Sequence, residues 1–309
     1  MESITLYNLS KMLLKASTRI IENKDKINAI NVFPVADSDT GSNLASTFLG
    51  IKKILEDRIS DSGVASLPRM TGFEFKDEII KSAFENSQGN SGIMMASFLK
   101  GFLTTLEEKD KIFLGDFAKA SKKGFDAARK SVGKPVKGTM LDVMTAFSES
   151  LMRHAEPIRS DNLNDIFYKA TQNTKTALFD TQKKLKILKE NHLVDAGALG
   201  FTYFILGLYE GLSNKYLELI GINLKPKLSN KEIGAIKFPH EVIFTIQNTE
   251  FSVMQIREML NPMGDCLDII KMEEKIKIHI HTDKPEVVKE TASLTGEIEE
   301  IKVVDIRYR

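Results

Sequence analysis

Two aspartates two residues apart, Asp37 and Asp39, stand between an apolar run that contains Pro34 and an apolar pattern of helical spacing that follows Thr40. Aspartates at the start of a helix commonly cap its free N–H groups. The same pair is also suited to hold a magnesium ion against a phosphate, because magnesium prefers oxygen ligands and shares them with phosphates. From the spacing alone, both interpretations stay open.

Three further turns stand directly before apolar helical patterns. They are residues 88–92 (QGNSG), 138–142 (GTMLD) and 194–200 (VDAGALG). Each turn alone is typical of an ordinary helix start with a cap. Glycines beside a helix start also let the backbone approach an anion. Four such turns in one helical domain are what a site on one rim of that domain requires.

His279 and His281 alternate along a predicted strand, so both imidazoles face the same side. Such a pair suits zinc, which needs a third and a fourth ligand. Two partly exposed strand histidines without a metal are the simpler interpretation of this spacing.

The stretch NVFPVADSDTGSN, residues 31–43, resembles the N-V-F-P-V-P-D-G-D-T-G-x-N signature of bacterial fatty-acid kinases. It is similar, more distantly, to the G-D-G-D-H-G turn of the ATP-binding subunit of dihydroxyacetone kinase. The chain departs from the signature at Ala36 and Ser38, where the family usually has proline and glycine. Val32 stands where the dihydroxyacetone enzymes carry a further aspartate. The resemblance implies that Asp37 and Asp39 bind magnesium and serve catalysis.

The other turns carry the same resemblance. GNSG matches the family's G-N-S-G-V-I-L, KPVKGTMLDV its K-P-V-E-G-T-I-L-T-V, and VDAGALG its V-D-A/S-G-G-x-G. ATP and Mg²⁺ are the implied cofactors. The implied nucleotide-binding residues are Thr40, Ser42, Asn43, Gly89, Asn90, Ser91, Gly92, Thr139, Met140, Asp195 and Gly197.

The segment KIKIHIHTDKPEVV resembles the family's V-K-V-H-V-H-T-D/N-x-P-G-x-V, in which the histidines are implied to bind metal. The family's further ligand is a cysteine in a Y-C-T-E segment, which matches Phe238-Pro-His-Glu241 here. His240 is therefore the expected third ligand of a zinc site with His279 and His281. We expect this site to be structural and separate from the magnesium site. Cys266 is expected to be a buried small residue.

The composition limits the class of protein. The chain has 309 residues, with 43 basic against 42 acidic side chains and a single cysteine. Near-neutral charge gives no field that would attract nucleic acid. One cysteine permits no intramolecular disulfide, and no apolar run reaches the roughly 20 residues of a membrane span. We expect a cytoplasmic protein that neither spans a membrane nor binds nucleic acid.

The apolar periodicity predicts eight helices and no strand before residue 215, with helices near 76–87, 91–107, 115–132, 139–155, 161–190 and 196–213 after the first two. Residues 60–75 are expected to be a loop. Beyond the helices, the order β-α-β-β-α-β predicts a small ferredoxin-like sheet. The fold class is therefore an eight-helix antiparallel barrel, as the resemblance implies, in residues 1–215, a linker in 216–238, and an α+β domain in 239–309.

The resemblance implies an ATP- and Mg²⁺-dependent kinase that phosphorylates the carboxylate of a fatty acid. A separate DegV-like fatty-acid-binding protein would present the acyl chain, and a homodimer is expected. The resemblance stops at VVDIRYR, where the full-length family continues into a third domain. Two alternatives stay open, namely a dihydroxyacetone-kinase-like phosphotransferase and a non-catalytic nucleotide-binding regulator.

Overall fold

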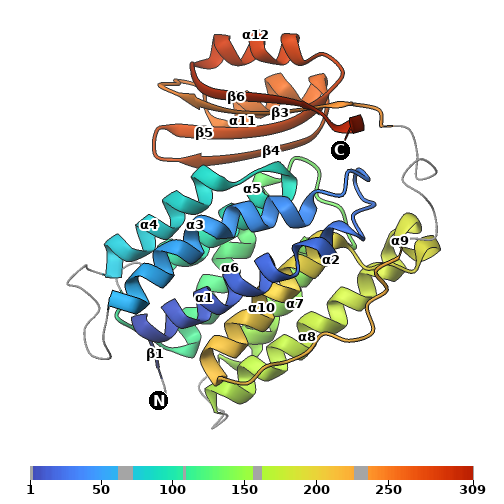
Figure 1. Ribbon diagram of the computed structural model, residues 1–309. Helices are drawn as coiled ribbons and strands as arrows, with labels where there is room; N and C mark the ends of the chain where they lie inside the picture. Colours follow the sequence, from blue (N-terminus) through green and yellow to red (C-terminus); the bar gives the residue numbers. More distant parts are fainter. Residues whose placement is uncertain (1–2, 62–71, 107–108, 156–161, 226–235, 309) are drawn as a thin grey trace.

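Eight long helices pack side by side beneath a small sheet in the computed structural model, which describes residues 3–61, 72–106, 109–155, 162–225 and 236–308 (Figure 1). The long helices are α1 (Leu6–Glu22), α3 (Thr40–Asp61), α4 (Gly72–Asn86), α5 (Gly89–Thr105), α6 (Leu114–Ser131), α7 (Met140–His154), α8 (Leu163–Lys184) and α10 (Ala196–Ser213). The predicted fold class is confirmed.

The helical core is built around α5 and α10, whose buried residues lie on all sides of each helix. Phe98 of α5 packs edge to face against Phe201 of α10, with ring centroids 5.2 Å apart. Gly207 of α10 lies so close to α1 that an added Cβ would come within 2.3 Å of the Ala16 Cα. Any larger residue there would push the two helices apart.

Several local predictions were wrong. The predicted helix 161–190 is divided, because Leu185 is extended between α8 and a short α9 (Lys186–Asn191) that buries Leu188. Two short strands precede residue 215. They are β1 (Ile4–Thr5) and β2 (Lys111–Ile112), which pair antiparallel and place the buried Ile4 opposite the buried Ile112.

Other differences concern the loops. A short α2 (Lys24–Asn28) comes between the first two predicted helices. The predicted loop 60–75 is helical at both of its described ends, since α3 runs to Asp61 and α4 begins at Gly72. The middle of that loop, residues 62–71, lies outside the described residues, as does 226–235 of the predicted linker.

The sheet region has four antiparallel strands in the order β4-β5-β3-β6. These are β3 (His240–Gln247), β4 (Asp265–Met272), β5 (Lys275–Thr282) and β6 (Glu297–Asp305). The helices α11 (Val253–Leu260) and α12 (Pro285–Thr295) cover one face, where Val242, Phe244, Ile278 and Ile280 form a second core. The opposite face lies against the helical region (Figure 1).

Cations of the sheet region cap two helices of the helical region. Lys277 of β5 donates to the carbonyls of Phe84, Glu85 and Ser87 at 2.8, 2.8 and 3.1 Å, at the end of α4. Arg257 of α11 donates to the carbonyls of Lys130 and Ser131, at the end of α6. Helix C-termini carry unsatisfied carbonyls and partial negative charge, so these contacts join the two regions.

Candidate functional site

The loop that carries Asp37 and Asp39 is held by two asparagine side chains. Asn31 accepts a hydrogen bond from the Thr40 amide at 2.9 Å and donates to the Val35 carbonyl at 2.7 Å. Asn28 accepts from the amides of Gly41 and Ser42. The first three N–H groups of α3 are therefore satisfied by the two asparagines, and the aspartates are not needed to cap them.

Both aspartates line a small cavity of about 30 Å³ between the helical region and the sheet. A cavity of this size holds one or two waters or small ions. Asp37 is 8% exposed, and Ser38 between the aspartates has a left-handed backbone with φ 56°. Of the nucleotide-binding residues predicted, Thr40, Asn43, Gly89, Asn90 and Ser91 line this cavity too.

The start of α5 forms one wall of the same cavity. Gln88, the residue before α5, makes no side-chain cap, so the amides of the first turn are not covered by that residue. Gly89 has φ 58°, and an added Cβ there would lie 2.2 Å from the side-chain nitrogen Nδ2 of Asn43. Ser91 Oγ donates to the Thr40 carbonyl at 3.3 Å, which joins the starts of α5 and α3.

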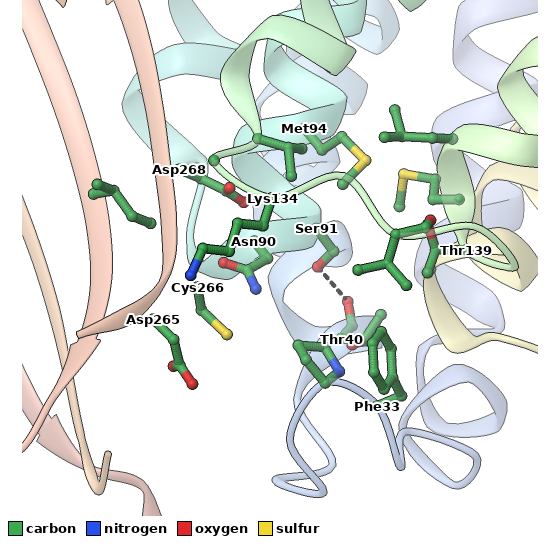
Figure 2. Close-up of a pocket in the computed structure, with 18 of the residues that line it drawn as sticks. Phe33, Thr40, Asn90, Ser91, Met94, Lys134, Thr139, Asp265, Cys266 and Asp268 are labelled. Atoms are coloured by element: carbon green, nitrogen blue, oxygen red, sulfur yellow. Dashed lines mark hydrogen bonds between the residues drawn. The ribbon is translucent and has the colours of Figure 1, made fainter. Parts of the chain in front are cut away.

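A larger cavity of about 260 Å³ adjoins the small one, and Pro34, Thr40, Asn90 and Ser91 line both. Its lining is rich in apolar side chains: Phe33, Met94, Val132, Val136, Met140 and Leu141. Thr139, Asp195 and Gly197, all predicted from the sequence, also line it. Figure 2 shows Lys134 reaching into this cavity toward Asn90 and Cys266.

Asp195 both caps the start of α10 and lines the larger cavity. Its carboxylate accepts a hydrogen bond from the Ala198 amide at 2.7 Å and so caps the helix. Burial raises the pKa of Asp195 to about 7, against the opposing effect of the backbone hydrogen bonds it accepts. It therefore offers the larger cavity a carboxyl group that titrates near neutrality.

Two of the predicted nucleotide-binding residues are not brought to either cavity. Ser42 is exposed, and its hydroxyl accepts from the Asn28 side chain at 2.9 Å. Gly92 packs against α3, where an added Cβ would meet Thr47 Oγ1 at 2.9 Å. Gly92 thus serves helix packing in this structure, and Ser42 lies on the outer side of the α3 start.

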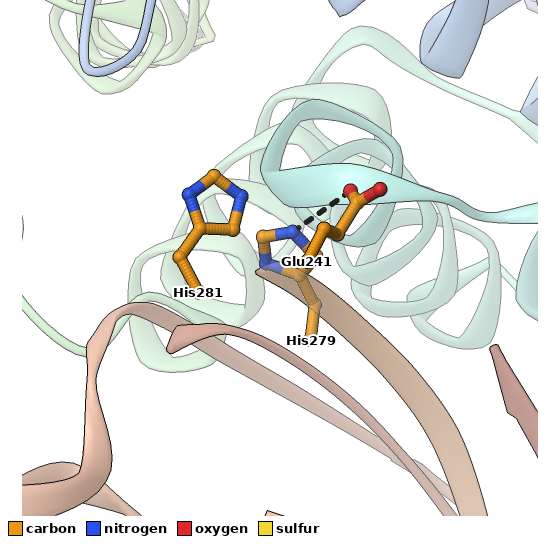
Figure 3. Close-up of side chains that lie close together, drawn as sticks. All are labelled: Glu241, His279 and His281. Atoms are coloured by element: carbon orange, nitrogen blue, oxygen red, sulfur yellow. Dashed lines mark hydrogen bonds and ion pairs between the residues drawn. The ribbon is translucent and has the colours of Figure 1, made fainter. Parts of the chain in front are cut away.

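His279 and His281 line the small cavity together with Asp37 and Asp39. The prediction that the histidines form a separate site is therefore wrong. Alternation along β5 and β3 turns the histidines and Glu241 toward the helical region, because Glu241 lies directly opposite His281. Ligand atoms of Glu241, His279 and His281 lie within 4.8 Å of one another (Figure 3).

His240 is not the third member of this group. It precedes Glu241 on β3 and so faces the other side of the sheet, with Nε2 4.0 Å from a carboxylate oxygen of Asp305. Its place beside the two histidines is taken by Glu241, whose Oε1 lies 3.1 Å from His279 Nε2. The matching of sequence segments could not separate these neighbours, because the register between β3 and β5 decides which one lies beside the histidines.

The charge state of the buried His279 depends on the acids around it. Burial lowers the pKa of His279, but the hydrogen bond and charge of Glu241, with Asp268, raise it above its usual value overall. Nδ1 of His279 lies 2.9 Å from the Cys266 carbonyl. With its amide nitrogen turned toward them, Asn90 lies within 3.1 Å of the Cys266 carbonyl, His279 Nδ1 and Asp268 Oδ2. The phosphate-binding turn predicted at Asn90 thus contacts the sheet directly.

Several residues of β4 line this cleft that no sequence motif indicated. Asp265, Cys266 and Asp268 line the larger cavity, and Cys266 is half-buried. Burial, and next the charge of Asp265, raise the pKa of the Cys266 thiol above its usual range. Burial also raises the pKa of Asp268 to about 7. Burial therefore disfavours the ionised forms of both groups on this side of the cleft.

A helical region with four loops on one rim, closed by a small sheet, matches a known domain class. Residues 34–210 match the DAK2 domain, which is more than half of the chain, so the chain belongs to the DAK2-domain family. Residues 236–308 match the middle domain of FakA-like fatty acid kinase proteins. The resemblance to bacterial fatty-acid kinases is thereby confirmed, and the chain is a kinase-family protein.

The chain is similar in sequence to proteins of several bacteria. An uncharacterized protein of Staphylococcus saprophyticus is 28% identical over 96% of this chain and 54% of its own length. Protein YloV of Bacillus subtilis is 27% identical over 96% of this chain and 55% of its own length. The chain spans about half the length of these relatives. Dihydroxyacetone kinase from C. freundii, solved with AMP-PNP and Mg²⁺, has a TM-score of 0.48 at 16% identity, over 65% of this chain and 33% of that one.

None of the helices in the described parts of the chain is long and apolar enough to cross a membrane.

Proposed function

We propose that this chain is the nucleotide-binding part of an ATP- and Mg²⁺-dependent kinase that transfers the γ-phosphoryl group to a fatty-acid carboxylate. The observation that carries the proposal is the shared lining of the small cavity. Asp37 and Asp39 meet the start of α5 there, next to a larger apolar cavity. Carboxylates beside helical N–H groups suit a metal-bound phosphate, and an apolar cavity suits a base.

Different residues of the two cavities would bind different parts of the metal-bound nucleotide. Asp37 and Asp39 would hold magnesium, which when bound neutralises phosphate charge during transfer. The phosphates would lie along Thr40, Asn90 and Ser91, because these residues line both cavities. Lys134 would add a positive charge beside the phosphates. It is the basic side chain among the described residues that line the larger cavity.

A carboxylate acceptor fits a site that works by positioning and charge. Carboxyl groups of this kind have a pKa of about 4, so the acceptor is ionised at neutral pH and no proton must be removed. One carboxylate oxygen bonds to the γ-phosphorus, the bond to the β-phosphate oxygen breaks, and ADP and an acyl phosphate result. Positioning and electrostatic stabilisation supply most of the catalysis in phosphoryl transfer.

The partner is part of the same proposal. A separate DegV-like fatty-acid-binding protein would present the carboxylate at the cleft between α3, α5 and the sheet, and the kinase would act as a homodimer. ATP consumption should therefore require the loaded binding protein. The assay compares this chain with ATP and Mg²⁺ alone, with the partner carrying a fatty acid, and with dihydroxyacetone. Consumption with dihydroxyacetone, or none with the loaded partner while ATP binds, would contradict the fatty-acid assignment.

A further inference from the structure

A bulge in β4 gives the sheet an additional set of metal-ligating side chains. Asp265 lies opposite His281 and Asp268 lies opposite His279, but the register shifts between these pairs. Cys266 and Leu267 therefore both stand opposite a single residue of β5, Ile280. Such a bulge re-aims the extra residue. Cys266 is that residue, with φ 52°, while Leu267 keeps its place in the apolar core.

The bulge brings three kinds of ligand atom together. One carboxylate oxygen of Asp265, the thiol of Cys266 and one ring nitrogen of His281 lie within 4.8 Å of one another. Asp265 and Cys266 line the larger cavity, and His281 lines the small one, so the three stand where the two cavities meet. Figure 2 shows Cys266 and Asp265 extending from the sheet into the space opposite Thr40 and Ser91.

The chemistry of the three atoms is selective. A sulfur, a nitrogen and an oxygen ligand together favour zinc over magnesium, because thiolates bind softer ions while magnesium keeps oxygen ligands. The neighbouring carboxylates, which disfavour a thiolate in the metal-free protein, favour a divalent cation at this place. A cation also lowers the pKa of a thiol that it coordinates.

We propose that Asp265, Cys266 and His281 form a zinc-type metal site, with the fourth position open toward the cleft. Three protein ligands and one open position are the arrangement of metal sites that take a water or a substrate oxygen. A phosphate oxygen of the nucleotide is the natural occupant of the open position, and this last point rests on the proposed kinase function. The metal site itself stands on the three side chains.

A second group, Glu241, His279 and His281, shares one histidine with this set and is its competitor for the ion. The two sets differ in chemistry, because only the Asp265 set contains sulfur. The chain has a single cysteine, so any metal–thiolate signal must come from Cys266. This makes the ligand sets distinguishable by spectroscopy without reference to catalysis.

The test is titration of the metal-free full chain with Co²⁺ in the absence of nucleotide, followed by zinc competition. One equivalent should bind and give a thiolate-to-cobalt charge-transfer band. Cys266→Ser should abolish the band and weaken zinc binding by roughly 100-fold, since losing even an outer-shell partner of a metal ligand costs 10–100-fold. Glu241→Gln should leave the band in place.

Circular dichroism checks that each variant folds, and Asp265→Asn gives a second test, with weaker zinc binding at an unchanged fold. A cobalt complex without a thiolate band would overturn the proposal. Unchanged zinc affinity in Cys266→Ser together with loss in Glu241→Gln would overturn it also. Since no nucleotide is present, failure here leaves the proposed kinase activity to be judged by its own assay.

Discussion

Replacing Lys277 by methionine should change how the stability of the protein depends on pH. Lys277 is 6% exposed and donates to three carbonyls at the end of α4. Burial lowers the pKa of Lys277 to about 8, from 10.5. Between these two pKa values the unfolded chain binds more protons than the folded one, so the free energy of unfolding rises with pH.

The magnitude follows from the two pKa values. The drop in pKa from 10.5 to about 8 corresponds to about 3 kcal/mol of unfolding free energy. The folded protein is less stable by this amount below pH 8, and the loss is recovered as the pH rises to about 10.5. At pH 7 the methionine variant loses three hydrogen bonds of about 1 kcal/mol each, but it also avoids the cost of burying the charge. The two effects nearly cancel at pH 7, and the slope with pH is the informative quantity.

Urea unfolding followed by circular dichroism from pH 7 to 10.5 measures this slope. The rise in unfolding free energy over that range should be about 3 kcal/mol smaller in Lys277→Met than in the wild type. Lys302→Met, an exposed lysine on β6, is the matched control and should keep the wild-type rise. Identical slopes in wild type and Lys277→Met would refute the argument that a buried ammonium caps α4.

Three further predictions concern the loop and the helix starts around the two cavities. Ser38→Gly should raise the free energy of unfolding by about 1 kcal/mol and preserve Mg·ATP binding, because Ser38 has φ 56°; a severe loss of affinity in calorimetry would contradict this. Gly89→Ala should abolish Mg·ATP binding, because Gly89 has φ 58°, which L side chains rarely adopt, and its Cβ would displace the Asn43 side chain that lines the small cavity. Gly115→Ala, with open space around it, should bind normally. In the wild type, the free energy of unfolding should fall as the pH rises from 4 to 7, because the folded pKa of Asp195, about 7, lies above the unfolded value of 3.8. Asp195→Asn should keep the α10 cap and remove this fall. An unchanged pH profile of unfolding in that variant would mean that Asp195 is already ionised in the folded protein.

The features that depend on local pattern were predictable from the sequence. Helical spacing after Thr40 and around the other turns predicted the helices, and strand alternation placed His279 and His281 on one face. Ser38 has a left-handed backbone conformation, as expected at a position where the family usually has glycine.

The features that depend on distant contacts were not predictable in the same way. The capping of α3 by Asn28 and Asn31 needs the turn after α2, which no periodicity reveals. The bulge that turns Cys266 into the cleft adds one residue to a strand without changing its composition. The meeting of the histidines with Asp37 and Asp39 follows from the docking of the sheet on the helical region, which the separate patterns could not show.

The most direct test of the central claim is calorimetric titration of Mg·ATP into the wild type, Asp37→Asn and Asp39→Asn. Asp25→Asn, an exposed acid on α2, is the control for the loss of one charge. We predict that the wild type and Asp25→Asn bind Mg·ATP equally, and that Asp37→Asn and Asp39→Asn lose the magnesium-dependent binding with their helical content intact. Wild-type binding of Mg·ATP by both cavity variants would contradict the assignment of these aspartates to the metal-bound nucleotide.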